Sequence, residues 1–238
     1  MSESQRFGEN SQNIVGGTNE HFGYNYNAAP AASAPAASAP TASAAGAEKQ
    51  TSEGVPSEYV RSRNVFVVHG RDEEVRHEMF ELLRRLDLRP LEWEELVKAT
   101  GRTSPYLGEV VANAPSQAQA ALVLLTPDDV AKLHPRLLGD DERDDETRLT
   151  GQPRQNVLIE LGMVLMAYPE RTIIVELGRL RRATDTEGLN VIRFDGSESA
   201  LAKIVARLKL AGCRLDDTRP GWRETGYFRD LSAYRRIA

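Results

Sequence analysis

One glutamate stands out in this sequence because it lies in an apolar, helix-like run. Glu160 lies within residues 153–166, where the residues that follow Asn156 are otherwise apolar or glycine. Helical spacing puts Val157 and Val164 on its own face, at i−3 and i+4. A helix that is apolar all round is normally buried, and an ionised carboxylate there requires a partner or a shifted pKa. Glu160 is therefore either half of a structural ion pair with an arginine or a group kept for chemistry.

Further candidate residues follow the first predicted strand. His69 and Gly70 end the run 65–68, and Gly70 permits close approach of the backbone to a ligand. The helix that follows would offer N–H groups to an anion such as a pyrophosphate; a plain turn capped by Asp72 is the alternative. His69 fits a turn hydrogen bond better than a catalytic base. Trp93 either stacks on an aromatic base or, as its commoner use, anchors the core.

Charged residues near two later elements have alternative roles as well. Asp128 and Asp129 either cap a short helix after Pro127 or point into the cleft, and the cap is favoured for one of them. Arg154 begins the helix of Glu160. It either holds a phosphate or neutralises Glu160 or the acidic segment that precedes it.

Several common sites are excluded by their missing motifs. The chain has no Gly-x-Gly-x-x-Gly after a strand, no P-loop and no Gly-x-Ser-x-Gly. The chain is not a phosphorylated receiver, because it lacks the acidic pair that a receiver needs after its first strand and the lysine that it needs after its fifth strand, which here ends at Phe194. The four histidines are scattered, and the single cysteine, Cys213, excludes an internal disulfide, so no metal site is expected.

Short apolar runs alternate with helical patterns from Asn64 onward, and this predicts the fold. Parallel strands buried by helices on both faces give an α/β, flavodoxin-like sheet of order 2-1-3-4-5, which binds ligands outside the carboxyl ends of its strands. A helix is expected to begin at Ser104–Pro105, another at Ser197 or Ser199, and 140–146 is expected to be a solvated loop. The strands are predicted at 65–68, around 90–91, and at 120–125, 172–175 and 190–194.

Composition divides the chain into four zones. Residues 1–27 are polar and Asn/Gly-rich, which predicts a disordered tail or, alternatively, a prion-like recruitment motif. Residues 28–61 form an Ala/Ser/Pro-rich linker. The folded domain is expected at 62–212, with a C-terminal extension at 213–238 whose role the sequence does not indicate.

The charge pattern and hydropathy restrict partners and location. The formal net charge is −5 without a basic stripe, which argues against nucleic acid as the main partner. No secretion signal and no apolar run long enough to span a membrane are seen. A cytoplasmic protein is therefore expected.

Three segments together resemble a known family. Residues 65–70, 124–129 and 154–162 are similar to the TIR-like family of bacterial predicted nucleotide-binding proteins, which includes effectors of cyclic-nucleotide-triggered anti-phage systems. The resemblance covers about 62–212 and implies a TIR-type NAD⁺ glycohydrolase with Glu160 as the catalytic residue. The NAD⁺-binding residues would then be His69, Gly70, Asp72, Trp93, Thr126, Asp128, Arg154 and Asn156.

The resemblance fits the chemistry of the reaction. Nicotinamide leaves NAD⁺ without being protonated, so one carboxylate beside an oxocarbenium-like ribose suffices, and no cofactor is expected. Alternatives are a cyclase that makes a cyclic ADP-ribose-type signal, or a non-catalytic TIR scaffold recruited through the tail.

Two features differ from the family pattern. Residues 166–171 replace a Gly-Lys-Leu-Gly-Arg-like segment, and the N-terminal sixty residues cannot form a sensor domain. Activation is therefore expected through the tail, a separate activating protein or second messenger, or assembly into a homo-oligomer or filament. Ile159, Met163 and Met166 are the predicted contact surface.

Overall fold

The structure, a computed structural model, describes residues 55–183 and 188–236. The predicted tail (1–27) and most of the linker (28–61) lie outside these ranges. Within the described residues, none of the helices is both long enough and apolar enough to cross a bilayer.

A five-stranded parallel sheet organises the domain, with strand order β2-β1-β3-β6-β7. This is the predicted flavodoxin-like order, and the prediction is confirmed. The register pairs Val65 with Ala120 and Val123 with Ile174. The strands are β1 (Asn64–Val68), β2 (Arg89–Leu91), β3 (Ala120–Leu125), β6 (Thr172–Leu177) and β7 (Val191–Phe194).

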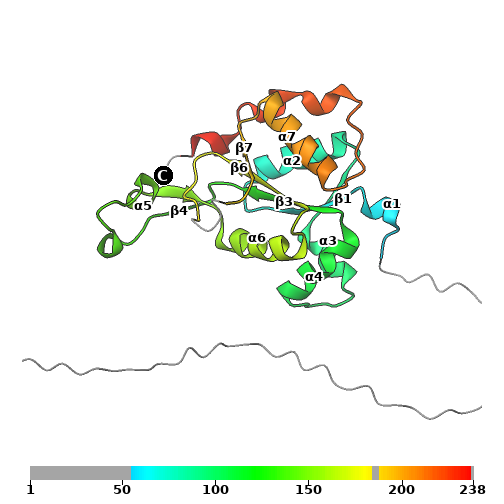
Figure 1. Ribbon diagram of the computed structural model, residues 1–238, viewed down its shortest axis with the longest axis horizontal. Helices are drawn as coiled ribbons and strands as arrows, with labels where there is room; N and C mark the ends of the chain where they lie inside the picture. Colours follow the sequence, from blue (N-terminus) through cyan, green and yellow to red (C-terminus); the bar gives the residue numbers. More distant parts are fainter. Residues whose placement is uncertain (1–54, 184–187, 237–238) are drawn as a thin grey trace, which may run out of the picture. The chain divides into compact units, whose positions relative to one another are not determined.

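Helices cover both faces of this sheet, which is why its central strands are apolar on both sides (Figure 1). Val65 and Val67 belong to the core under α2 and α7, whereas Phe66 and Val68 belong to the core under α3, α4 and α6. The helices are α1 (Glu58–Arg61), α2 (Glu73–Arg85), α3 (Trp93–Ala99), α4 (Leu107–Gln117), α5 (Asp144–Thr147), α6 (Gln155–Ala167) and α7 (Glu198–Leu210).

The helix predicted at Ser104–Pro105 begins later than expected. It is α4, which starts at Leu107 after the N-cap Tyr106. The cause is an element that was not predicted: α3 begins at Trp93, and its first turn is closed by a capping box between Glu92 and Glu95. Since α3 takes up the start of this segment, Ser104 and Pro105 remain in the connection that leads to α4. By contrast, the predicted N-cap Ser197 does cap α7, where its hydroxyl accepts the N–H of Ala200.

The short helix predicted after Pro127 does not form. Instead, β4 (Asp129–Ala131) pairs antiparallel with β5 (Thr150–Gln152) in a small second sheet. Backbone pairing between distant segments therefore outweighs the local capping preference of the aspartates. The segment 140–146, predicted to be a loop, contains the start of α5.

The C-terminal extension packs into the core beneath α2 and α7. Trp222, Phe228 and Leu231 are buried with residues of those helices, and the rings of Phe194 and Phe228 meet edge to face at 5.2 Å. Its backbone is mostly short 3-10 turns, at Pro220–Arg223, Thr225–Phe228 and Ser232–Arg235.

The substitution Gly196→Ala tests this packing. Gly196 has φ +75°, and a Cβ there would lie 2.5 Å from the carbonyl oxygen of Phe228. We expect a loss of about 1–3 kcal/mol in the free energy of unfolding, measured by urea titration. Gly226→Ala is the matched control, because nothing lies within 4 Å of its Cβ position. Equal effects of the two substitutions would contradict this packing of the extension.

Candidate functional site

Helix α6 holds Glu160 at the border between core and solvent. Its buried stripe of Val157, Leu161 and Val164 packs into the core shared with Phe66 of β1. Glu160 lies on the flank of that stripe and is partly buried. The helix is not buried all round, since its outer side is exposed to solvent.

The carboxylate of Glu160 has no hydrogen-bond or ion-pair partner among the residues the structure describes. The ion pair considered from the sequence is therefore not formed with any described arginine. Arg154 lies elsewhere, with its Nε 3.5 Å from Oδ2 of Asp129. Burial without a compensating charge raises the pKa of Glu160 above its ordinary value.

The two flanks of α6 face different neighbours. Glu160 shares its flank with Met163, whose Cε lies 3.6 Å from the Cβ position of Gly108 in α4. Leu158 lies on the opposite flank and lines a cavity of about 350 Å³ beside Glu176. Glu160 therefore faces the α4 side of the domain, away from that cavity.

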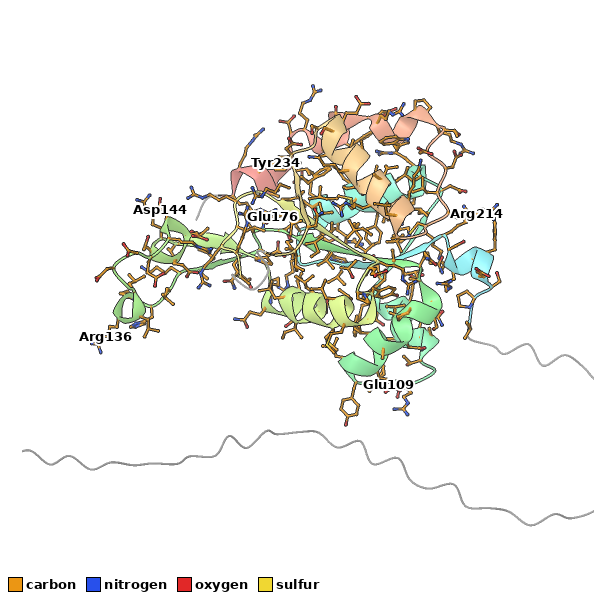
Figure 2. The ribbon with its side chains drawn as sticks, in the orientation of Figure 1. Glu109, Arg136, Asp144, Glu176, Arg214 and Tyr234 are labelled. Carbon is orange, nitrogen blue, oxygen red and sulfur yellow. The ribbon has the colours of Figure 1, made fainter. Side chains whose placement is uncertain are left out.

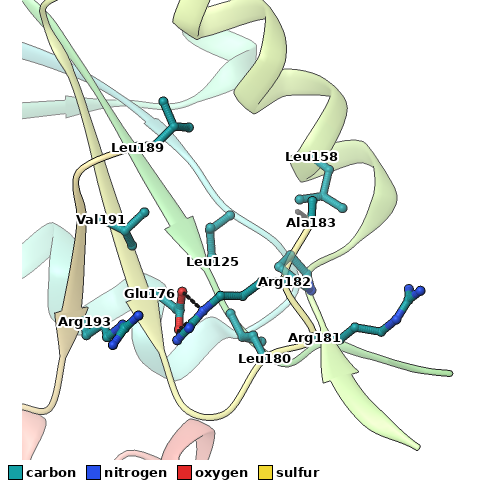
Figure 3. A pocket seen from close by; sticks show the side chains of 11 residues that line it. Leu125, Leu158, Glu176, Leu180, Arg181, Arg182, Ala183, Leu189, Val191 and Arg193 are labelled. Atoms are coloured by element: carbon teal, nitrogen blue, oxygen red, sulfur yellow. Dashed lines mark hydrogen bonds and ion pairs between the residues drawn. The ribbon is translucent and has the colours of Figure 1, made fainter. Parts of the chain in front are cut away.

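The cavity beside Leu158 contains a carboxylate that the sequence analysis overlooked. Glu176 is 6% exposed near the end of β6, and Figure 3 shows the side chain of Arg182 extended toward it. Nη2 of Arg182 lies 2.6 Å from Oε1, and its Nε approaches both carboxylate oxygens. A glutamate in an apolar strand was the available signal, but this one is neutralised by its arginine.

Gly70 is required at the end of β1 by a neighbouring carboxylate. A Cβ at this position would lie 1.7 Å from Oδ2 of Asp128, which accepts the N–H of Arg71 at 2.7 Å. Asp72 caps α2 by accepting the N–H of Val75 at 3.0 Å. Two of the N–H groups expected to face an anion are thus bound by the chain's own aspartates. Asp128 does not cap a helix, because β4 follows it.

Arg236, from the C-terminal extension, compensates these two aspartates. Its Nη1 lies 2.8 Å from Oδ2 of Asp72 and 3.8 Å from Oδ1 of Asp128. Both carboxylates are nearly inaccessible, with 2% and 3% of their side chains exposed. An arginine between two buried acids offsets much of their desolvation and joins the extension to the ends of β1 and β3.

The remaining predicted site residues are more scattered. Nδ1 of His69 lies 2.9 Å from the carbonyl oxygen of Gly70, and its ring meets Phe80 of α2 edge-on. Trp93 is partly buried against Phe66, as a core anchor would be.

The predicted set is therefore only partly gathered. Thr126 is buried, and Asn156 is exposed in the first turn of α6. The structure brings together Gly70, Asp72 and Asp128, with Arg154 beside Gly70. Within the described ranges, no three His, Cys, Asp or Glu side chains gather as metal ligands.

The comparison with family models gives one match. Residues 64–196 match the model described as "CAP12/Pycsar effector protein, TIR domain". The match spans the sheet from β1 to β7 together with Glu160. No curated protein matches the chain.

The difference between the two glutamates predicts stability effects of opposite sign. Glu176→Gln should lower the free energy of unfolding by about 1–3 kcal/mol, because it removes the charge that pairs with Arg182. Glu160→Gln should raise it by less than about 1 kcal/mol at neutral pH, because it removes a desolvated charge.

The pH dependence supplies the control for this pair. The pKa of Glu160 is raised on folding, so its ionisation costs stability as pH rises through that pKa. The advantage of Glu160→Gln should therefore vanish below the unfolded value of about 4.3, where Glu160 is protonated in both states. Chemical denaturation at several pH values measures this, and a large destabilisation by Glu160→Gln would indicate a hidden partner.

Proposed function

This chain belongs to the CAP12/Pycsar effector TIR-domain family, and we propose that it is an NAD⁺ glycohydrolase of bacterial anti-phage defence, acting in the cytoplasm. The observation that carries the proposal is the unpartnered, partly buried carboxylate of Glu160.

The reaction needs little beyond such a group. Breaking the bond between nicotinamide and ribose releases neutral nicotinamide and leaves positive charge on the ribose, and water then attacks the anomeric carbon. A nearby carboxylate stabilises that charge, and it does so most strongly when it is desolvated and not already neutralised by an arginine. Glu160 meets both conditions, whereas Glu176 is neutralised by Arg182.

Three of the remaining predicted residues are assigned to substrate binding. Arg154 lies next to Gly70 at the start of α6 and would contact the pyrophosphate as a cation. Its present partner, the partly exposed Asp129, holds it by one contact of 3.5 Å. The exposed Asn156, one turn before Glu160, would bind a ribose hydroxyl. Trp93, partly buried against Phe66, would contact the substrate only with the part of its ring that is left exposed.

The substitution Glu160→Gln tests catalysis directly. We expect release of nicotinamide from NAD⁺ by the assembled protein to fall by at least about 10²-fold, because an amide cannot stabilise the developing positive charge. The wild-type rate should also decline as pH falls through a pKa above the ordinary glutamate value, since the ionised form is required.

Two controls accompany this assay. Glu170→Gln makes the same change at an exposed residue just after α6 and should leave turnover unchanged. Chromatography of the products separates ADP-ribose from a cyclic product, the outcome expected of a cyclase. No turnover by the wild-type chain under any assembling condition would favour the scaffold, and wild-type turnover in Glu160→Gln would exclude this residue from the mechanism.

Self-association is the second part of the proposal. On the outer side of α6, Ile159 is 56% exposed and Met166 is 86% exposed. Met163, the third residue of the predicted contact surface, packs partly against the core instead. Apolar side chains this exposed, on the helix that carries Glu160, are suited to contact a second copy of the chain.

Charge on this surface should block assembly. The double substitution Ile159→Lys, Met166→Lys should abolish oligomers in light scattering and lower NAD⁺ turnover, without changing the melting temperature by more than a few degrees. Leu210→Lys, on the outer end of α7 at 81% exposure, is the matched control. Oligomers of wild-type size in the double variant would show that α6 is not the contact.

A further inference from the structure

A cavity of about 650 Å³ lies where the small second sheet meets the C-terminal extension. Lys132 follows β4, Arg148 and Thr150 come from the approach to β5 and its first residue, and Arg179 follows β6. Tyr234 and Arg236 supply the wall from the C-terminal extension. Figure 2 labels Tyr234, which belongs to the C-terminal extension.

The lining of this cavity is cationic. Lys132, Arg148, Arg179 and Arg236 border it, and none of the described lining residues is acidic. Lys132, Arg148 and Arg179 have no ion-pair partner among the described residues, and Arg236 is shared between Asp72 and Asp128. Lys132, Arg148 and Arg179 are exposed to solvent, which screens their repulsion, but three unpaired cations beside one cavity make a favourable place for an anion.

One other cavity, bordered by Arg193, Lys203 and Arg207, also has no acidic lining residue, but it is smaller, at about 440 Å³, and its cations come from β7 and α7 alone. The cavity beside Glu176 contains Arg182 paired with Glu176 and Arg181 paired with Glu146, and a neighbouring cavity contains Asp144 and Asp145. Arg179 borders that neighbouring cavity too, but it forms no ion pair with either aspartate.

A neutral donor completes the lining. The hydroxyl of Tyr234 is buried without a hydrogen-bond partner, and burial raises its pKa, so it stays protonated at neutral pH. Thr150, by contrast, already donates to the carbonyl oxygen of Arg148 at 3.1 Å. A buried hydroxyl without an acceptor is costly. Because this oxygen is closed to solvent, a ligand oxygen in the cavity would accept from it only after the ring of Tyr234 turns toward the cavity.

We propose that this cavity binds a polyphosphate group, carried by a nucleoside triphosphate or as an inorganic chain. Several adjacent phosphates match Lys132, Arg148 and Arg179, which a single monoanion would leave largely uncompensated, and the volume suits a ligand larger than one phosphate. None of these lining residues belongs to the set assigned to NAD⁺, so the inference goes beyond the proposed function. Arg236 would connect such a ligand to the aspartates at the ends of β1 and β3.

Calorimetric titration of the full chain with ATP, inorganic triphosphate and monophosphate tests the proposal. Both triphosphates should bind with an affinity that falls as salt rises, and monophosphate should bind at least about tenfold more weakly. Tighter binding of ATP than of triphosphate identifies a nucleotide as the source of the group, and the reverse order identifies an inorganic chain.

Matched variants locate the site. Arg148→Ala and Arg179→Ala should each weaken triphosphate binding roughly tenfold while melting temperatures stay within a few degrees. Arg229→Ala, an exposed arginine of the same extension outside the cavity, should bind as the wild type does. Glu160→Gln should also bind normally, which separates this site from catalysis. Undetectable binding, binding insensitive to Arg148 and Arg179, or displacement by one equivalent of NAD⁺ would overturn the proposal.

Discussion

The carboxylate of Glu160 is partly withdrawn from water without a compensating charge among the described residues, and the candidate site depends on this condition. A flexible loop could not maintain it, because the side chain would simply return to solvent. The condition is maintained by α6, whose stripe of Val157, Leu161 and Val164 is anchored in the core against β1 and β3. Burial of that stripe supplies the free energy that offsets the cost of desolvating one charge beside it.

Other buried acids of the described chain are compensated by neighbouring donors and cations. Asp72 accepts a helix N–H, Asp128 accepts the N–H of Arg71, and Glu176 is held by Arg182. One oxygen of Asp72 and one of Asp128 form no hydrogen bond, but Arg236 lies beside both, so each of the three carboxylates has a compensating cation and is poorly placed to stabilise a foreign one. Glu160 is the exception, and an exception to the rule that buried charges are paired is most readily explained by function.

How well the sequence predicts each part of this structure depends on how far apart along the chain the interacting residues lie. Strands such as 65–68 and 120–125 are predictable because burial on both faces selects short continuous apolar runs. The three-residue strands β4 and β5 have no such run. They form because their backbones pair with each other, and the sequence of either segment alone does not indicate this pairing. The contact of Arg236 with Asp72 joins residues far apart in the chain and is equally invisible in the sequence. The sequence indicates that Glu160 is unusual, but only the folded structure shows whether an arginine neutralises it.

The electrostatics of the carboxyl edge explain why cations from distant segments gather there. In parallel α/β sheets this edge collects helix N-termini and turn N–H groups, and it commonly binds anionic ligands. Here Asp72 and Asp128 bind two of those N–H groups, which adds negative charge to the edge. Anion binding then has to come from side chains. Arg236 of the C-terminal extension contacts these aspartates, and Arg154 of α6 lies beside Gly70 and Asp129. The basic cavity shares Arg236 with this edge. An anion bound there would therefore affect the ends of the strands through Arg236 without contacting Glu160.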